Sequence, residues 1–407
     1  VFWMWVAAFF GMMTNFSENL LGIYYRRRNK DGEWSGGPMY YLRDGLGKRY
    51  GIKWLSPVSK VLAVLFSCFA ILASFGIGNM AQINKIVLNM DAAFFQNASL
   101  GMIPGTEINI IHLIIGIGLL IIGALIIIGG LQRIARVAEI VVPFMAVAYV
   151  IGSLVIFCIN IKQVGPMFVA IFKFAFTPAA MLGGGIGVLI KKTMTQGFKR
   201  GVFSNEAGLG SSVLVHSSSN VKEPVKQGMW GIFEVFFDTF VVCTMTAVVV
   251  LSTGYIDLAT GSPVGDLNGD TLVSQAFGQY FGAPGTWFVA IAMLFFAFTT
   301  VLGWSQYGSK AVEYLFGTTG VKVYKFIFVA MIVSGAIMEG GLAWDLSDTF
   351  NGLMMIPNLI GVVSLLPLVL KITKNYVDRK IKGKDVAPML SYDEAIQVET
   401  MQHLDED

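Results

Sequence analysis

Apolar runs of roughly 20 residues recur along this chain, separated by short polar loops. A helix of about that length spans the roughly 30 Å of hydrocarbon in a bilayer. The runs are continuously apolar rather than alternating with period two, which excludes a closed β-barrel. Because 55% of the 407 residues are hydrophobic and only 14% are charged, the surrounding solvent must be lipid. The sequence therefore predicts an all-α, polytopic transmembrane helix bundle in contact with a lipid bilayer.

The pattern predicts nine spans. They run from Val1 to Tyr25, Pro57 to Val87, Asn109 to Gly129, Val137 to Asn160, at an undetermined place between Val164 and Ser219, and then from Gln227 to Gly254, Trp287 to Tyr307, Val323 to Met338, and Trp344 to Leu370. The fifth span is ambiguous because 164–190 and 183–219 both offer a segment of suitable length.

The distribution of Lys and Arg among the loops predicts the orientation, since cytoplasmic loops hold the excess of these residues. The loop 26–53 carries eight of them, whereas the loops 88–107 and 255–286 carry none. We therefore expect the first loop and the tail beyond Lys371 to face the cytoplasm of a multi-pass protein in the cell membrane. We also expect the tail to be partly disordered.

The remaining composition argues against an enzyme and against nucleic-acid binding. The net charge of +3 arises from basic residues on separate loops rather than in one groove. Three cysteines lie within apolar runs and three histidines are widely scattered, so neither set predicts a metal site. The sequence contains no phosphate-binding loop or nucleophile motif, and we expect no bound cofactor.

Polar residues inside the predicted spans are the first candidates for function, because each costs free energy in lipid. Thr299 and Thr300 are adjacent in an apolar run, where two hydroxyls and a nearby carbonyl, such as that of Phe296, could ligate a bare cation. Such hydroxyls equally often bond their own helix or a neighbouring helix. Glu18 and Asp238 could likewise be ligands or hydrogen-bonded anchors between helices.

The segment 201–212 combines three glycines with a polar Ser-Asn-Glu core. Glycine costs about 1 kcal/mol against alanine inside a helix, so we expect this segment to be broken or to lie at a helix end. Transporters use broken helices to expose backbone groups to a substrate near the midplane. A cytoplasmic loop is the alternative, favoured by the basic residues at 191, 192, 199 and 200, and composition leaves both open.

Several long strings resemble one known family. They are Phe2-Trp3-Met4-Trp5 followed by Phe10-Gly11, Trp34-Ser-Gly-Gly-Pro-Met-Tyr-Tyr41, Lys199-Arg-Gly-Val-Phe-Ser-Asn-Glu-Ala-Gly-Leu-Gly210, Phe237-Asp238-Thr239 and Ile356-Pro357-Asn358. In these strings the chain resembles the alanine or glycine:cation symporters, also called sodium:alanine symporters. They are rare strings and are spread over nearly the whole chain, which makes a chance match improbable.

The resemblance implies eleven helices with the five-plus-five inverted repeat of the LeuT-type fold. Val1 already lies inside an apolar span, so we expect the first two of the eleven helices to be missing from this sequence. The first of the three expected parts, 1–160, is the remainder of the first repeat and holds the second to fifth core helices. Residues 161–371 are the second repeat, and 372–407 are a cytoplasmic tail.

The resemblance also implies sodium-coupled uptake of L-alanine, glycine or a similar amino acid by alternating access. It places the second broken helix at 183–219, and the expected substrate-binding residues are Ser204, Asn205, Glu206, Gly208, Gly210, Asn79 and Gln82. It places Thr299 and Thr300 where a sodium ion is held. A proton-coupled carrier using Glu18, Glu206 or Asp238, and an amino-acid sensor that does not transport, are the alternatives.

Overall fold

The computed structural model describes residues 1–47, 55–95, 100–176, 186–265, 269 and 271–404. The elements of its first half are α1 (Phe2–Tyr24), β1 (Arg27–Arg28), β2 (Trp34–Ser35), α2 (Pro38–Tyr40), η1 (Tyr41–Leu46), α4 (Leu55–Phe75), η2 (Gly76–Met80), α5 (Ala81–Met90), η3 (Asp91–Phe95), α6 (Ile110–Ile127), α7 (Leu131–Ile159) and α8 (Ile161–Phe176). Those of its second half are α9 (Ile186–Asn205), α10 (Val213–His216), α11 (Pro224–Phe236), η4 (Phe237–Cys243), α12 (Thr244–Ser252), α13 (Leu272–Phe281), α14 (Ala283–Ile337), α15 (Gly340–Tyr376), η5 (Val377–Ile381) and α16 (Glu394–Gln402).

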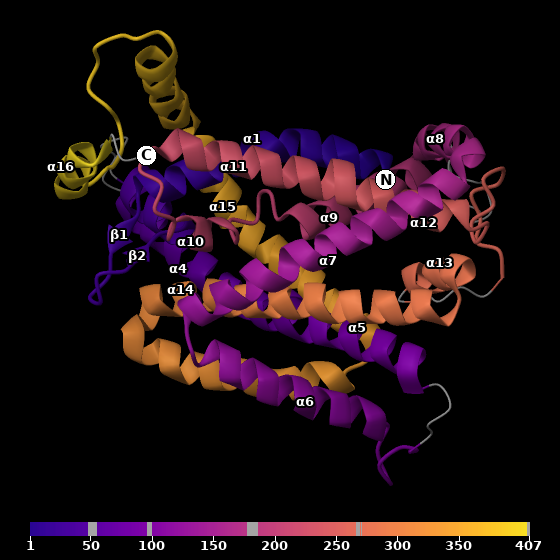
Figure 1. Ribbon diagram of the computed structural model, residues 1–407. Helices are drawn as coiled ribbons and strands as arrows, with labels where there is room; N and C mark the ends of the chain where they lie inside the picture. The colour runs from indigo at the N-terminus through magenta and orange to yellow at the C-terminus, as the bar shows by residue number, and fades with distance from the viewer. Residues whose placement is uncertain (48–54, 96–99, 177–185, 266–268, 270, 405–407) are drawn as a thin grey trace.

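The predicted helical bundle is confirmed, and six helices among the described residues are long and apolar enough to cross a membrane. They are Leu55–Phe95, Ile110–Ile127, Leu131–Ile159, Pro224–Ser252, Ala283–Ile337 and Gly340–Ile381. α1 and α9 fall outside this group because polar and charged side chains interrupt their apolar surface. The two helices pack against one another, and α1 lies along one side of the bundle (Figure 1).

The long helix α14 is two spans joined by a sharp turn. Gly317 has non-helical backbone angles (φ 71°), and the chain folds back on itself there. Tyr324 consequently meets Gly308 and donates to or accepts from the hydroxyl of Ser74 at 2.8 Å. This confirms the prediction of separate spans at 287–307 and 323–338.

Loops with the same predicted sidedness gather at the same end of the bundle. The β1–β2 hairpin, α10 and α16 lie at one end in Figure 1, and the N-terminus, α8 and α13 lie at the other. β1 and β2 are antiparallel, with Arg27 opposite Ser35 and Arg28 opposite Trp34. We call the first of these ends the hairpin end, and it is the end that the loop charges predict to be cytoplasmic.

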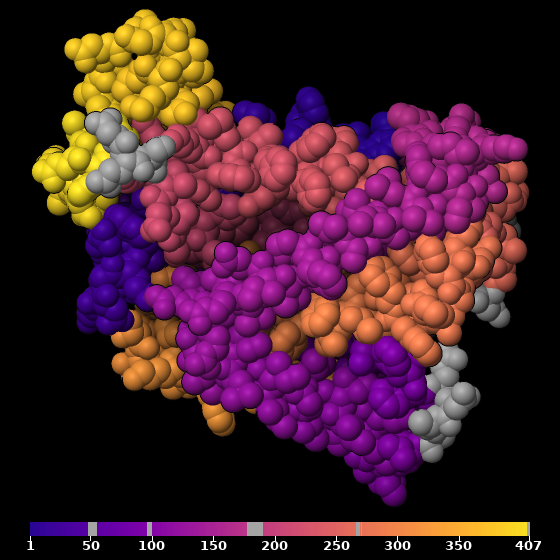
Figure 2. Space-filling view, viewed as in Figure 1, coloured from indigo at the N-terminus to yellow at the C-terminus, as the bar shows by residue number. Residues whose placement is uncertain are grey.

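Glycines let α11 approach α1 closely, as small residues do between membrane helices. A Cβ added to Gly228 would lie 2.9 Å from the carbonyl oxygen of Phe16, and one added to Gly231 would lie 2.6 Å from Oδ1 of Asn15. On the outer surface, α7 runs diagonally between α11 and the first half of α14 (Figure 2). α1 therefore turns its polar face, with Asn15 and Glu18, towards protein, whereas Phe9 and Phe10 on its other face are exposed.

The C-terminal tail contains the helix α16, whereas residues 383–391 have no helix or strand, and the expected partial disorder stays a prediction. α16 returns to the hairpin end, where Glu399 pairs with Arg28 at 2.7 Å. The buried carboxylate of Glu223 accepts two hydrogen bonds from Arg379, at 2.8 and 2.9 Å. The tail forms the yellow lobe of Figure 2, and these charge-assisted bonds fix it to the loops at the hairpin end.

Candidate functional site

The helix formed by α9 and α10 is interrupted over residues 206–212, which we call the unwound loop. Glu206, Gly208 and Gly210 have positive φ angles of 56°, 92° and 74°. Glycine adopts such angles without the steric cost that a Cβ brings. The prediction that this segment leaves the helix is confirmed.

The unwound loop lies about halfway along α1 rather than beyond its end. Gly197 meets Trp3, Ala207 meets Gly11, and Val213 meets Gly22, so α9, the loop and α10 follow α1 in order. The basic residues upstream are therefore on the half of α9 that points away from the hairpin end. This geometry puts the break inside the bundle rather than in a loop beyond the helix ends, whereas neither α8 nor α9 is among the described helices long and apolar enough to cross a membrane, so the position of the fifth span stays a prediction.

Glu18 of α1 anchors the unwound loop to α15. Its carboxylate is 0% exposed and accepts hydrogen bonds from the side-chain amide of Asn358 and from the backbone N–H of Gly208, the latter at 3.4 Å. Asn358 also donates to the carbonyl of Gly208 at 2.8 Å, and its own oxygen accepts from the hydroxyl of Tyr41. Every polar group in this set has a partner, which is the arrangement that makes a buried network rigid.

A second set of bonds holds the end of α9 against η4. Ser204 donates to Asp238 at 2.9 Å, and Asn205 donates to the hydroxyl of Thr239 at 3.0 Å. The oxygen of Asn205 accepts from the backbone N–H of Ala207 at 3.1 Å. Asp238 thus has the geometry of a helix anchor, and the side chains of Ser204 and Asn205 support the loop from behind.

Glu206 points from the unwound loop towards the first half of α14. It accepts a hydrogen bond from Ser211 at 2.7 Å, and Trp304 and Tyr307 lie within hydrogen-bonding reach of its carboxylate. The indole of Trp304 is itself packed against Gly78 of η2. Glu206 therefore connects the loop with α14 and, through Trp304, with η2.

Asn79 and Gln82, which the resemblance placed together in the substrate site, point in different directions. Asn79 is fully buried and donates to the carbonyl of Phe328, in the second half of α14, at 2.7 Å. Gln82 instead lines a cavity of about 420 Å³. The π-helical turn η2, which contains Asn79, separates the two residues by more than an α-helical step would.

This cavity, which we call the central cavity, also brings in Phe296 and lies beside the end of α9. Its remaining aromatic walls are Phe203, Tyr149 and Trp344. The hydroxyls of Thr299 and Thr300 donate to the carbonyl of Phe296, at 3.0 and 2.9 Å, and Thr299 also bonds the carbonyl of Phe295. The two hydroxyls are therefore one helical turn from the cavity wall.

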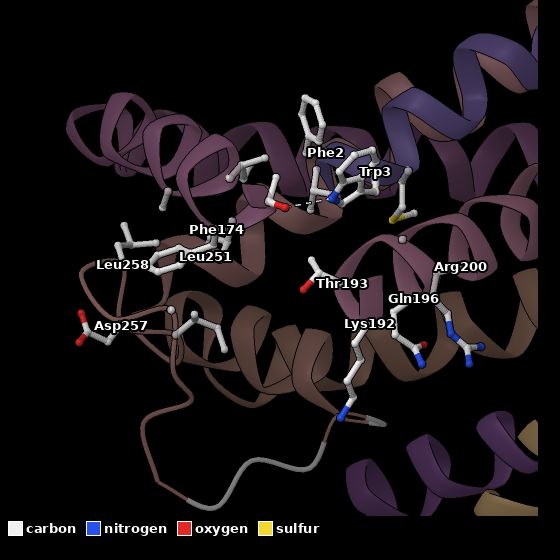
Figure 3. A pocket seen from close by; sticks show the side chains of 18 residues that line it. Phe2, Trp3, Phe174, Lys192, Thr193, Gln196, Arg200, Leu251, Asp257 and Leu258 are labelled. Atoms are coloured by element: carbon white, nitrogen blue, oxygen red, sulfur yellow. Dashed lines mark hydrogen bonds between the residues drawn. The ribbon is translucent and has the colours of Figure 1, made fainter. Parts of the chain in front are cut away.

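A larger cavity of about 570 Å³ is lined by residues of α1, α8 and α9 (Figure 3). Phe2 and Trp3 of α1 face Lys192 and Gln196 of α9 across it, and Trp3 donates to the carbonyl of Ala175 at 3.1 Å. None of the residues that we predicted to bind substrate or sodium lines this cavity. We therefore take the central cavity and the unwound loop as the candidate site.

A cationic cluster separates the two cavities. Asp348 of α15 pairs with both Lys199 and Arg200 of α9, at 2.9 and 3.0 Å. The guanidinium of Arg200, which lines the larger cavity, lies 4.3 Å from the ring centre of Trp344, which lines the central one. Sequence reasoning missed this cluster because the pairing crosses about 150 residues of chain.

Asn358 and Tyr41 are also functional candidates that we did not assign from sequence. Both belong to strings that carry the family resemblance, and Asn358 is a polar residue after Pro357 in an apolar span. Such a position is expensive unless it is partnered. A polar residue in an apolar span therefore marks Asn358 in the sequence, but the sequence does not show that Glu18 and Tyr41 are its partners.

Comparison with known proteins identifies the family of this chain. Residues 1–389 match the model of the sodium:alanine symporter family. The chain belongs to this family. It is 41% identical over 386 residues to the sodium/alanine symporter AgcS of Methanococcus maripaludis, covering 95% of this chain and 79% of that one.

Two further relatives are named for amino-acid transport. The amino-acid carrier protein AlsT of Bacillus subtilis is 35% identical over 388 residues, covering 95% of this chain and 75% of AlsT. A Bacillus subtilis protein named probable sodium/glutamine symporter GlnT is 34% identical over 387 residues, covering 95% and 73%. The chain is thus a multi-pass membrane transporter and not an enzyme.

Proposed function

We infer that this protein couples the uptake of a small neutral amino acid, alanine or glycine, to a sodium ion by alternating access. The observation that carries this proposal is the unwound loop at mid-length of α1, in a chain of the sodium:alanine symporter family. A broken helix places irregular backbone beside a substrate near the bilayer midplane. The loop is also rigidly held by the Glu18 and Asp238 networks, so its backbone groups are preorganised.

We propose that the loop between Glu206 and Gly210 borders the substrate and shapes its site, because the backbone N–H groups of Ala207 and Gly208 already donate to Asn205 and Glu18. The side chains of Ser204 and Asn205 already bond η4, so they act by positioning the loop. Gln82 reaches the substrate from the wall of the central cavity, while Asn79 fixes η2 against α14. At Gly210 the neighbours Pro38 and Asn358 leave room for hydrogen only, so the space beside the loop is small and suits a substrate with a hydrogen or methyl side chain.

We propose that sodium is ligated by the hydroxyl oxygens of Thr299 and Thr300. Each hydroxyl donates its proton back to the helix, and this leaves its oxygen lone pairs available for a cation. The carbonyl of Phe296 already accepts both of these bonds, so we expect it to be the weakest of the three sodium ligands. Hard cations take oxygen ligands of this kind, and the remaining ligands would come from elsewhere in the symporter.

We further propose that residues 1–160 and 161–371 are the two inverted repeats, with 372–407 as the tail. The support is the position of the broken α9–α10 helix at the start of the second unit and the fold-back of α14 at Gly317. The central cavity lies away from the hairpin end, where the largest apolar cluster of the described residues is packed. The proposed state is therefore open to the outside and closed towards the cytoplasm.

Uptake of labelled alanine by the full-length protein in liposomes tests the function. We expect a sodium gradient to drive uptake and its replacement by choline to abolish it at every pH tested. Uptake that persists in choline and follows a pH gradient would instead establish proton coupling. Alanine binding without counterflow of labelled alanine would make the protein a sensor and refute transport.

A further inference from the structure

The segment Trp34–Tyr41 is part of the family resemblance, but the proposed function gives it no role. It begins in β2 at the hairpin end, passes through α2, and reaches the start of η1. Its two ends therefore contact different parts of the molecule. One end meets the cytoplasmic loops, and the other meets the network that holds the unwound loop.

At the hairpin end, Trp34 joins three elements. The guanidinium carbons of Arg26 and Arg28 lie 4.0 and 4.1 Å from its ring centre. Its carbonyl accepts hydrogen bonds from Lys310 at 3.0 Å and from Ser218 at 3.4 Å. The hairpin is thereby bonded to the middle of α14 and to the chain that follows α10.

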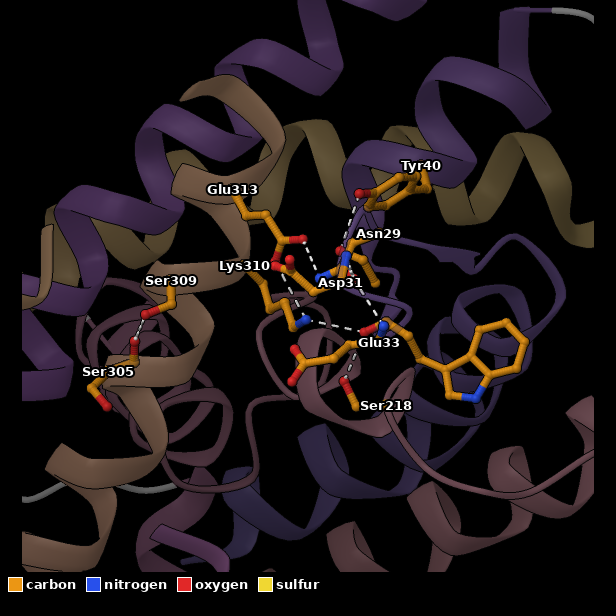
Figure 4. Close-up of polar contacts among 11 residues, drawn as sticks. Asn29, Asp31, Glu33, Tyr40, Ser218, Ser305, Ser309, Lys310 and Glu313 are labelled. Carbon is orange, nitrogen blue, oxygen red and sulfur yellow. Dashed lines mark hydrogen bonds and ion pairs between the residues drawn. The ribbon is translucent and has the colours of Figure 1, made fainter. Parts of the chain in front are cut away.

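Lys310 makes its bond from a buried position. It is only 6% exposed, and its charge is balanced by Glu313 at 3.4 Å. Glu313 also accepts a hydrogen bond from Asn29 of the hairpin at 2.9 Å, so the same pair holds the hairpin twice (Figure 4). A buried, charge-assisted arrangement of this kind is costly to break one partner at a time.

Arg26 fixes the chain after α10 from the other side. Its guanidinium donates to the carbonyl oxygens of Ser217, Ser219 and Val221, at 3.4, 2.6 and 2.8 Å. We call this set of bonds, made by Arg26, Trp34 and Lys310, the hairpin lock. It holds the cytoplasmic half of the broken helix against the hairpin and α14.

Two glycines let the segment lie directly on α10. A Cβ added to Gly36 would lie 2.5 Å from Cβ of Ser217, and one added to Gly37 would overlap the side chain of Leu214. Leu214 is itself 0% exposed. The seal between the hairpin and α10 is therefore close, with space for hydrogen only.

At its other end the segment touches the unwound loop. Pro38 lies against Gly210, where an added Cβ would be 2.6 Å from Cγ of the proline. Tyr41 donates to Asn358, which in turn donates to the carbonyl of Gly208. A shift of the loop must therefore move Pro38, Tyr41 or both.

We propose that Trp34–Tyr41 is the element that couples the unwound loop to the cytoplasmic closure, and that Lys310 and Trp34 hold this closure. This inference rests on the proposed function. Occupation of the loop by substrate displaces Pro38 and the hydroxyl of Tyr41, and this displacement withdraws Trp34 from Lys310. Release of the hairpin then frees α10 and opens the path to the cytoplasm.

The test measures closure directly, without transport. In the full-length protein with Cys68, Cys158 and Cys243 replaced by alanine, Leu214→Cys places a thiol beneath the hairpin. A membrane-impermeant maleimide is applied from the cytoplasmic side of inside-out vesicles. We expect Lys310→Met to raise the labelling rate at least tenfold, and Lys322→Met, at an exposed site on the same helix, to leave it unchanged.

A second pair of variants keeps the proposal testable if Lys310→Met fails to insert. Gly36→Ala forces the hairpin from Ser217 and should also speed labelling, whereas Gly303→Ala, with no atom within 4 Å of the new methyl group, should not. Equal labelling in wild type and in the inserted lock variants would overturn the proposal. Alanine uptake is measured separately, so a protein that does not transport would refute the proposed function without changing the labelling result.

Discussion

The two glycines of the unwound loop differ in their surroundings, and this difference predicts unequal costs of substitution by alanine. Gly208 has φ 92°, and the nearest atom to an added Cβ is Leu359 Cδ2 at 3.5 Å, an ordinary contact. Gly208→Ala should therefore cost only the left-handed backbone term, about 1 to 2 kcal/mol of the free energy of unfolding. Gly210 has φ 74°, and its Cβ would meet Pro38 at 2.6 Å and Asn358 at 2.8 Å. Overpacking adds about 1 to 3 kcal/mol, so Gly210→Ala should cost about 2 to 5 kcal/mol.

Gly352 of α15 supplies the matched control. It has helical backbone angles and no atom within 4 Å of an added Cβ. Gly352→Ala should gain up to about 1 kcal/mol from helix propensity. Equilibrium unfolding of the three purified variants in detergent micelles measures the order. Gly210→Ala as stable as Gly208→Ala would refute the close approach of Pro38, and wild-type stability in both would refute the left-handed loop.

Three further predictions concern the cation, the tail and the topology. Thr299→Val and Thr300→Val should each weaken sodium binding by about 1 to 3 kcal/mol. This corresponds to a roughly 5- to 150-fold rise in the sodium concentration needed for half-maximal alanine uptake. If both variants show the sodium dependence of the wild type, the two hydroxyls only bond their own helix. Arg379→Met leaves the buried Glu223 carboxylate without its partner and should lower the free energy of unfolding by about 3 to 5 kcal/mol. Adding Glu223→Gln should recover most of that loss. An unchanged free energy of unfolding in the single variant would show that the pair is dispensable. A cysteine at the exposed Asp31 should react with an impermeant reagent only after permeabilisation, and reaction on intact cells would reverse the orientation.

The burial of Ser35 makes it a poor position for testing the orientation of the first loop. Ser35 lies in the same basic loop and would be an obvious labelling position. It is, however, only 1% exposed and accepts a hydrogen bond from Tyr40 at 3.1 Å. Failure to label it from outside would say nothing about orientation, because the side chain is inaccessible from either side. Asp31, at the tip of the hairpin, has no such ambiguity.

Most of the predicted spans coincide with long apolar helices of the described residues because their signal is local, whereas α1 and α9 are too polar to be counted among them. About 20 apolar residues between polar loops suffice, and the fold-back of α14 follows from the basic residues at 310 and 322 between two apolar runs. The break at 206–212 was equally local, since glycines at 208 and 210 weaken a helix wherever they occur.

The direction of individual polar side chains was not predictable in the same way. Asn79 and Gln82 are three positions apart and should share a helical face, but the π-helical turn η2 rotates one away from the other. Hydrophobic periodicity carries no signal for such a turn. The partners of Ser204 and Asn205, and the docking of the tail on Arg28, depend on contacts over 34 to 371 residues of chain.

The bond between Glu18 and Asn358 spans 340 residues, and this has a consequence for biosynthesis. At about 5 to 20 residues per second, a ribosome needs roughly 20 to 70 seconds to reach Asn358 after Glu18 has been made. During that interval α1 has a carboxyl group but not the α15 amide that will hold it. The interim partners are other helices or the insertion machinery, because lipid offers no hydrogen bonds. α1 must therefore remain beside that machinery, or move back into the bundle, until the last long helix emerges.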